Sequence, residues 1–120
     1  GSNDDGTITI IEIASNTVRE TFAVGQTPIR IRFVNGGSGA LITDPKAGEL
    51  IVVDVKSKSV AKRIKVAGIP VGILVAPNGR EVYVASMQVN QVFRFDTKTF
   101  NLIDQMATGD GPDGVAWAIR

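Results

Sequence analysis

The chain has 120 residues, with 13 basic and 12 acidic side chains and a formal net charge of +1. This balance gives no reason to expect the broad attraction to nucleic acids or anionic membranes that strongly basic proteins show. The sequence contains no histidine and no cysteine. Disulfides, thiol nucleophiles, imidazole bases and histidine-built zinc sites are therefore excluded within these residues. No apolar run is long enough to span a membrane, so we expect no membrane insertion of this segment.

The first five residues stand apart from the rest of the chain. Gly1-Ser2 resembles a scar left by protein expression, so we expect residues 1–5 to form a disordered start outside the repeats. From Gly6 onward the sequence repeats every 42 residues and aligns without an insertion. The repeat columns are 6–47, 48–89 and 90–120, and the spacing is marked by Pro28, Pro70 and Pro112. A fixed period of this length is typical of repeat architectures, in which each unit leaves a face that its neighbour covers.

The repeating unit is predicted to be made of β-strands. Valine and isoleucine together account for 28 residues, against four leucines, and β-branched side chains favour strands over helices. The first predicted strand is 6–13. A second outer strand follows it, and the two complete blades then have strands 28–34, 39–44, 49–55 and 59–66, and 70–76, 80–86, 91–96 and 101–107. No stretch sustains a helical period over three turns, so helices are nearly excluded.

Turn residues separate the predicted strands. Pro77-Asn78-Gly79, Gly36-Gly37 and Lys46-Ala47-Gly48 supply the fixed or positive φ angles that tight hairpin turns require. Four short antiparallel strands at a constant spacing describe a propeller blade. The predicted fold is therefore all-β, a partial β-propeller built from 42-residue four-stranded antiparallel blades, with two complete blades and flanking strands.

The middle repeat resembles a known family. Its run 70–85, Pro-Val-Gly-Ile-Leu-Val-Ala-Pro-Asn-Gly-Arg-Glu-Val-Tyr-Val-Ala, followed by Asn90-Gln91-Val92 and Asp96-Thr97, is similar to the YVTN-type β-propeller repeat. The family includes lactonase-like and surface-layer propellers, and the resemblance covers residues 6–119. It implies that the Pro-x-Gly segment lies nearest the central channel, that residues 112–119 form another such inner strand, and that the protein is periplasmic or extracellular.

The length of the chain leaves two accounts of the ring open. Four to eight blades need roughly 170–340 residues at this period, more than the 120 present. The chain is then either part of a larger propeller or one member of a ring-forming oligomer. A head-to-tail pair would place 112–119 beside 6–13 in the parallel sense, which is an awkward join. Both accounts leave unpaired strand edges, which predicts self-association.

Two arginines depart from the repeat. Arg30 and Arg32 occupy positions at which the next repeat has Gly72 and Leu74, and they lie on one side of the first inner strand. Neighbouring guanidinium groups need an anionic partner or water. The arginines therefore suggest a site for a small anionic ligand near the channel, while an inter-blade salt bridge or a solvated channel wall is the alternative.

Loops on one face of the propeller supply the other candidate ligand residues. Propeller ligands commonly bind where variable loops stand on a rigid scaffold. The full set of candidate ligand-binding residues is Gln26, Arg30, Arg32, Asp44, Lys46, Gln88, Asp110 and Asp113. No catalytic residue, metal ligand or cofactor is predicted.

Residues in two further columns of the repeat are interpreted as structural. Asp54 and Asp96, with Glu12 in the same column, end their strands before polar turns, where a carboxylate accepts turn N–H bonds. Trp117 shares its column with Phe33 and Val75 and is predicted to lie in the core.

Function remains open among three classes. The favoured hypothesis is a non-catalytic scaffold that binds a small anionic ligand or a protein on the loop face or in the channel. The alternatives are a fragment of a propeller enzyme, either a lactonase-like hydrolase or a redox-enzyme subunit, whose active site lies elsewhere, and a structural surface-layer module.

Overall fold

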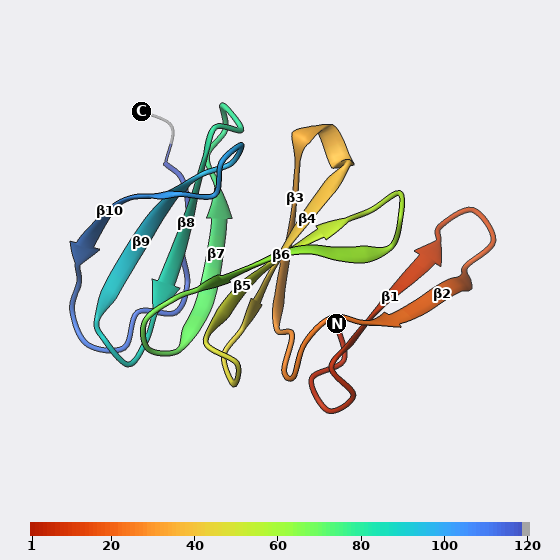
Figure 1. Cartoon of the computed structure of the whole chain (residues 1–120), viewed down its shortest axis with the longest axis horizontal. Helices are drawn as coiled ribbons and strands as arrows, with labels where there is room; N and C mark the ends of the chain where they lie inside the picture. Colours follow the sequence, from red (N-terminus) through yellow and green to blue (C-terminus); the bar gives the residue numbers. More distant parts are fainter. Residues whose placement is uncertain (119–120) are drawn as a thin grey trace.

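The computed structural model describes residues 1–118, which form three antiparallel sheets (Figure 1). The strands are β1 (Thr7–Glu12), β2 (Thr17–Ala23), β3 (Arg30–Val34), β4 (Gly39–Asp44), β5 (Glu49–Asp54), β6 (Ser59–Lys65), β7 (Pro70–Val75), β8 (Glu81–Ser86), β9 (Gln91–Asp96) and β10 (Leu102–Ala107). The one helical element in the described part is a single 3-10 turn, Asn35–Gly37. No helix in residues 1–118 is long and apolar enough to cross a membrane.

Two of the sheets are complete four-stranded blades. In the first blade the strand order is β3-β4-β5-β6, and in the second it is β7-β8-β9-β10, so each strand pairs with the next along the chain. The third sheet is the hairpin β1-β2, which precedes the first blade. This architecture confirms the predicted partial propeller, and the strand ends agree with the predicted ones to within two residues.

A backbone irregularity recurs once per repeat. In the outer hairpins β1-β2, β5-β6 and β9-β10, the pairing register shifts by one residue. The residues left without a partner are Arg19, Ala61 and Ile103, which are spaced 42 residues apart. The turns of the same hairpins carry positive φ at Asn16, Lys58 and Phe100, again 42 apart. A bulge increases the local twist of a sheet, so the three hairpins share their shape although their sequences differ.

The core lies between the blades. Leu41 and Leu50 of the first blade share one buried cluster with Ile73, Val82 and Phe93 of the second. A second cluster joins Ile8 and Val24 of the β1-β2 part to the opposite face of the first blade. β7 packs directly against β3 and β4, and Thr43 donates a buried 2.8 Å hydrogen bond to the Val71 carbonyl. Each blade is therefore held by its neighbour.

The N-terminal residues extend the repeat pattern. Residues 1–5, expected as a disordered start, form a turn in which Ser2 pairs with Thr7. This pairing has the same register as Asp44 with Glu49, which lie 42 residues later in the chain. Ser2 therefore lies where the second strand of a blade ends, beside the edge of β1 that faces away from β2.

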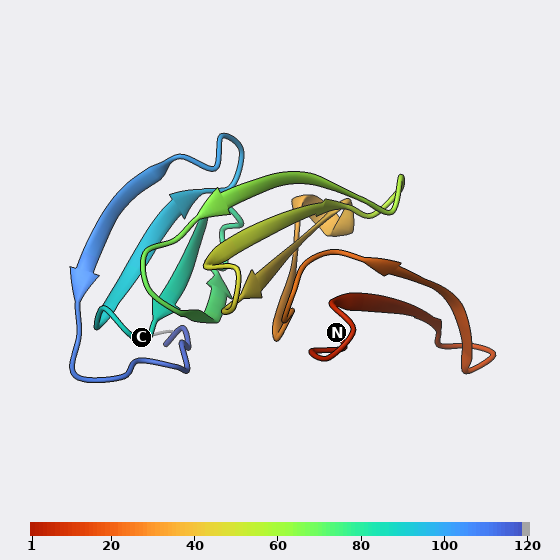
Figure 2. The same cartoon turned by 60° about the horizontal axis from the view of Figure 1, so that its bottom comes forward.

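The C-terminal segment returns to the second blade. After β10 the chain passes below that blade and rises again behind it (Figures 1 and 2). A Cβ placed on Gly72 would lie 1.7 Å from the Asp113 carbonyl oxygen and 3.3 Å from Ala85. Asp113 and Ala85 are the repeat equivalents of Val71 and Thr43, so residues 112–118 lie on the second blade as β7 lies on the first.

The inner strand predicted at 112–119 is not observed in the described residues. Residues 112–118 pair with no strand, and residue 119 lies outside the described part. A strand is held by hydrogen bonds to a neighbour, and no second strand of that blade is present among residues 1–118. The prediction that Trp117 lies in the core is also wrong, because no second strand lies beside its segment in the described residues. Its side chain is 49% exposed, and its column mate Phe33 is 66% exposed.

Replacing Gly72 with alanine should displace the C-terminal segment, because the added methyl group has no room beside Asp113. Trp117, the only tryptophan, packs on Tyr83 with ring centroids 6.1 Å apart and reports this contact. We expect Gly72→Ala to shift Trp117 emission to longer wavelength while the far-ultraviolet circular dichroism keeps its β-sheet form. Gly114→Ala is the control, since nothing lies within 4 Å of its added Cβ. Unchanged emission in Gly72→Ala would show that the segment is not docked in this way.

Candidate functional site

The two predicted arginines lie on the inner strand β3. Both side chains are exposed, and each donates a hydrogen bond to the backbone carbonyl of the residue before it. The Arg30 guanidinium lies 4.0 Å from the Asp113 carboxylate. That distance is too long for a hydrogen bond. Among residues 1–118, no carboxylate lies within 4.0 Å of the Arg32 guanidinium. The pair therefore keeps several donors open to an anion.

Asp113 comes from the docked C-terminal segment, so the structure brings two of the predicted residues together across β7. The Arg30 and Asp113 side chains are each about half exposed, at 49% and 52%. Solvent screens a pair of this kind, and such pairs contribute little to stability. An incoming carboxylate or phosphate would meet a weakly held partner at Arg30 and none at Arg32.

The loop face is organised by one buried carboxylate. Asp44 is fully buried at the end of β4. It accepts hydrogen bonds from the backbone N–H groups of Gln26 at 2.6 Å, Thr27 at 3.1 Å and Ala47 at 3.1 Å, and from the Thr27 hydroxyl at 2.9 Å. Asp44 therefore ties the loop after β2 to the turn after β4, and its acceptor sites are filled by the chain itself.

The pKa of Asp44 is lowered by these contacts. Burial opposes ionisation and is the largest single influence, but the hydrogen bonds from Gln26, Ala47 and Thr27 together outweigh it. Asp44 is therefore an ionised structural group at neutral pH. Its repeat equivalent, Ser86, also connects the end of its strand to a loop, but it does so as a donor. The Ser86 hydroxyl donates a hydrogen bond to the Ala67 carbonyl at 2.5 Å.

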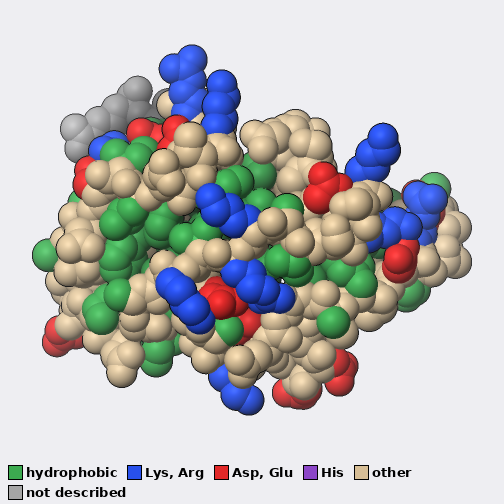
Figure 3. All heavy atoms as spheres, in the orientation of Figure 1, with side chains coloured by type: hydrophobic (Ala, Val, Ile, Leu, Met, Phe, Trp, Pro, Cys, Tyr) green, Lys and Arg blue, Asp and Glu red, His purple; other side chains and the backbone are tan. Residues whose placement is uncertain are grey.

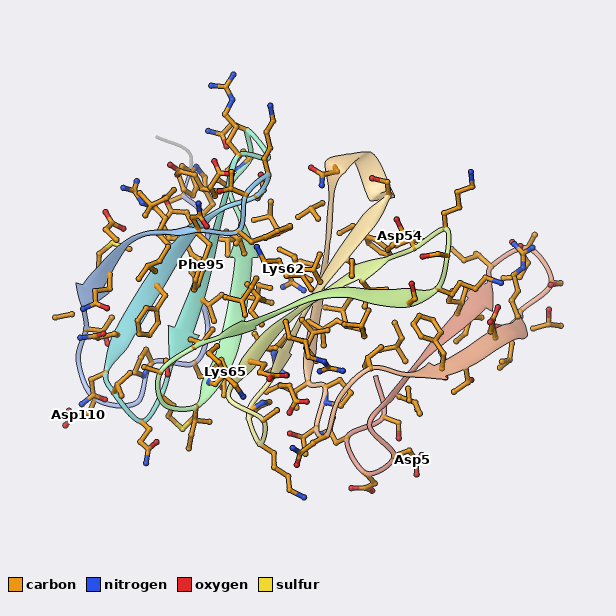
Figure 4. The ribbon with its side chains drawn as sticks, viewed as in Figure 1. Asp5, Asp54, Lys62, Lys65, Phe95 and Asp110 are labelled. Carbon is orange, nitrogen blue, oxygen red and sulfur yellow. The ribbon has the colours of Figure 1, made fainter. Side chains whose placement is uncertain are left out.

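Of the remaining predicted loop residues, Lys46 adjoins the Asp44 cluster, and Asp110 and Gln88 belong to loops of the second blade. Thr27 links Lys46 to the Asp44 cluster, because its hydroxyl accepts a 3.0 Å bond from the Lys46 backbone N–H. Asp110 accepts a 3.1 Å bond from the Asn90 side chain and projects from the loop after β10 (Figure 4). Gln88 is exposed. Their roles in binding stay predictions.

A charged pocket that sequence reasoning missed opens beside the Asp44 cluster. It has a volume of about 450 Å³. The lining residues are Ala23, Val24, Gly25, Gln26, Ala47, Glu49, Arg63 and Lys65. Glu49 pairs with Arg63 at 3.1 Å and Lys65 at 2.9 Å. Figure 3 shows acidic side chains next to basic ones on one face of the molecule, and Figure 4 labels Lys65 on β6.

The charged side chains of this pocket are paired with one another. The pKa of Glu49 is lowered because the hydrogen bond from Lys65, helped by Arg63, outweighs burial. Arg63 also donates to the Val24 carbonyl at 2.6 Å, which joins the first blade to the β1-β2 part. The sequence did carry a signal for these residues. Glu49, Arg63 and Lys65 stand where the following repeat has the uncharged Gln91, Gln105 and Ala107.

The turn carboxylates are positioned as predicted. Asp54 accepts bonds from the backbone and side chain of Ser57 at 2.6 and 2.8 Å, and Asp96 accepts from the backbone N–H groups of Lys98 and Thr99, both at 2.8 Å. These bonds lower the pKa of both groups. Glu12 instead pairs with Arg19 at 3.2 Å. In residues 1–118, no three potential ligands gather as a metal site would require.

Comparison with known proteins agrees with the fold. No family model matches the chain. The "Uncharacterized protein YncE" of Salmonella typhi and that of Salmonella typhimurium are each 31% identical over 120 residues, which cover 96% of this chain and 34% of the relative. The chain therefore spans about a third of the length of these relatives.

Two solved structures superpose closely on the chain. One is a chain of Kuenenia stuttgartiensis hydrazine synthase, with a TM-score of 0.88, 25% identity, and coverage of 93% of this chain and 33% of that chain. The other is the structure titled U3-55K, with a TM-score of 0.82, 10% identity, and coverage of 92% and 36%. The recurring blades and these likenesses together show that the chain has the fold of part of a β-propeller.

Proposed function

We propose that the chain is a non-catalytic binding scaffold made of YVTN-type propeller repeats, and that it holds a small anionic ligand at Arg30 and Arg32. The repeat columns 6–47, 48–89 and 90–120 are proposed as its structural units. The YVTN-like run in the middle repeat and the bulge that recurs every 42 residues support this assignment. The family resemblance also supports a periplasmic or extracellular location.

The observation that carries the proposal is the open arginine pair. β3 presents two guanidinium groups on one side, and the nearest carboxylate, Asp113, lies at 4.0 Å from Arg30. Elsewhere on the chain, as at Arg63 and Arg94, arginines lie much closer to their acidic partners. Guanidinium groups bind carboxylates and phosphates through paired N–H donors. An anion is therefore the ligand class that this strand suits best.

The carboxylates support a role without acid–base chemistry. A general acid or base works best when its pKa lies near the working pH. The pKa values of Asp44, Glu49, Asp54 and Asp96 are all lowered, and each group is occupied by hydrogen bonds from the chain. These groups hold loops and turns in place.

A second candidate is a segment of a redox-enzyme subunit. The 25% identity and TM-score of 0.88 to a chain of hydrazine synthase favour it. Under this hypothesis the reacting groups lie outside residues 1–118, and the blades described here act as a scaffold. Binding of an anion by the chain alone would favour the scaffold hypothesis.

The arginine pair should bind inorganic phosphate or sulfate. We expect the double variant Arg30→Gln/Arg32→Gln to weaken phosphate binding at least about tenfold, because charge-assisted hydrogen bonds contribute about 1.5–3 kcal/mol each. Titration followed by NMR measures this, with Arg80→Gln, at an exposed turn position, as control. Equal phosphate affinities of the double variant and the control would show that Arg30 and Arg32 do not form the binding site.

Asp44→Asn should destabilise the loop face. Asp44 has a lowered pKa in the folded protein, so its ionised form contributes stability above the ordinary carboxyl pKa of about 3.9. This contribution is lost as the pH falls below that value and through the folded-state pKa. At pH 7 we expect a loss of about 2 kcal/mol in the free energy of unfolding. Urea denaturation at several pH values measures it, with Asp4→Asn, at an exposed N-terminal position, as control. A loss that does not shrink in acid would contradict this account.

We also propose that the isolated chain self-associates. Both ends of the chain leave strand edges open, and the exposed apolar side chains include Ile11, Phe33 and Trp117. Light scattering over a dilution series should show a mass that rises with concentration above the monomer value of 12.7 kDa. A constant monomer mass at tens of micromolar would count against this proposal.

A further inference from the structure

The dipeptide Asn-Gly occurs twice in the chain, at Asn35-Gly36 and at Asn78-Gly79. Both lie in the turn that joins the first two strands of a blade, one between β3 and β4 and the other between β7 and β8 (Figure 1). The two dipeptides are displaced by one position within the repeat, since Gly36 is the equivalent of Asn78. The same reactive pair of residues is therefore held in two different backbone settings.

Asn-Gly can lose its side-chain amide without an enzyme. The backbone nitrogen of the glycine gives up its proton and attacks the side-chain carbonyl carbon of the asparagine, and ammonia leaves. Water then opens the resulting cyclic imide at either carbonyl, which yields aspartate or isoaspartate. The net reaction consumes water, converts an amide into a carboxylate, releases ammonia and changes no oxidation state. Glycine favours the attack because it has no Cβ beside the nitrogen.

The first site is open to this reaction. Asn35 and Gly36 are both exposed in the 3-10 turn at the end of the β3-β4 hairpin, and nothing lies within 4 Å of a Cβ placed on Gly36. The N–H groups of a first helical turn have no partner within the helix. Among residues 1–118, no hydrogen-bond partner of the Gly36 N–H or of the Asn35 side chain is found. Both reacting groups are therefore free.

The second site is held closed by hydrogen bonds, although Asn78 and Gly79 are also exposed. The Gly79 N–H, which carries the attacking nitrogen, donates to the Ala76 carbonyl at 2.8 Å. The Asn78 side-chain oxygen accepts a 2.9 Å bond from the Arg80 backbone N–H, which fixes the orientation of that side chain. The Thr97 hydroxyl donates to the Gly79 carbonyl at 2.7 Å and ties the turn to the loop after β9. Attack at Asn78 must first break such bonds.

We propose that Asn35 is a deamidation site of the folded protein, and that the fold protects Asn78 from the same reaction. The new carboxylate at residue 35 lowers the formal net charge of the chain by one. It arises in a hollow of about 440 Å³ that Asn35 lines together with Arg80 and Lys98 of the second blade. The modification therefore adds an acid beside two basic side chains where the two blades meet. This inference does not depend on the arginine pair of β3.

Peptide mapping by mass spectrometry of the full chain tests the proposal. Trypsin releases Asn35 within residues 33–46 and Asn78 within residues 66–80, and neither peptide contains another asparagine or a glutamine. During incubation of the native protein at mildly alkaline pH, we expect deamidation at Asn35 to be at least about tenfold faster than at Asn78, because several hydrogen bonds protect the second site. In concentrated urea both turns are open, so the two rates should converge.

Two sets of variants connect the rates to the turns. Thr97→Val keeps the side-chain shape but removes the bond to the Gly79 carbonyl, so it should speed the reaction at Asn78 about fivefold and leave Asn35 unchanged. On ion exchange, the aged wild-type protein should form an acidic species that elutes with fresh Asn35→Asp. Asn35→Gln should not form that species. Circular dichroism checks that each variant folds, and the comparison of native and unfolded wild-type protein stands without them.

The proposal fails if Asn35 does not react in the native protein, or if Asn78 reacts at the same rate or faster. A difference that persists unchanged in urea would also overturn it, since the local sequence would then be the cause. An unchanged Asn78 rate in folded Thr97→Val would contradict the protection assigned to this turn.

Discussion

The structure depends on apolar contact between neighbouring blades. A four-stranded sheet has two faces, and in the first blade both are buried, one against the β1-β2 part and one against β7 and the second blade. Full burial of one valine, leucine, isoleucine or phenylalanine contributes about 1.5–3 kcal/mol. No blade could gain this alone. Hydrogen bonds surround the apolar contact between the blades. Examples are the bond from Arg63 to the Val24 carbonyl and the bonds that Asp44 accepts from the loop after β2.

The last blade differs from the first at the face turned away from its neighbour. Leu41 and Val52 are buried on the first blade, and their repeat equivalents are Tyr83 and Arg94. The Tyr83 hydroxyl donates to Glu81 at 3.0 Å, and Arg94 pairs with Asp104 at 2.7 Å. Tyr83 and Arg94 are partly buried, and their polar groups have hydrogen-bond partners within the second blade. Blades with the same backbone thus differ in the polarity of this face by exchange of a few side chains.

The strands could be predicted because local and repeat signals agreed. Gly48 and Gly79 adopt positive φ in the turns that were predicted for them. The 42-residue period predicted the position of each strand in the second blade from its equivalent in the first. The candidate site was predicted only in part. Arg30 was found because it breaks the repeat, but its distance from Asp113 depends on how the C-terminal segment docks. Glu49, Arg63 and Lys65 also break the repeat, yet their convergence arises from pairing between β5 and β6 and from the adjoining β1-β2 part.

Comparison of equivalent positions in the repeats explains why we look for function at residues that differ from their repeat equivalents. Positions that recur, such as the bulges at Arg19, Ala61 and Ile103, maintain the common blade shape and say little about one particular ligand. Gly72 leaves room for the Asp113 carbonyl on β7, whereas the same position on β3 carries Arg30. The backbone thus tolerates a long charged side chain at one inner strand and excludes any side chain at the next. This asymmetry places cationic groups on one inner strand of an otherwise regular array, and the pairing of β3 with β4 fixes the backbone positions from which the two arginine side chains extend.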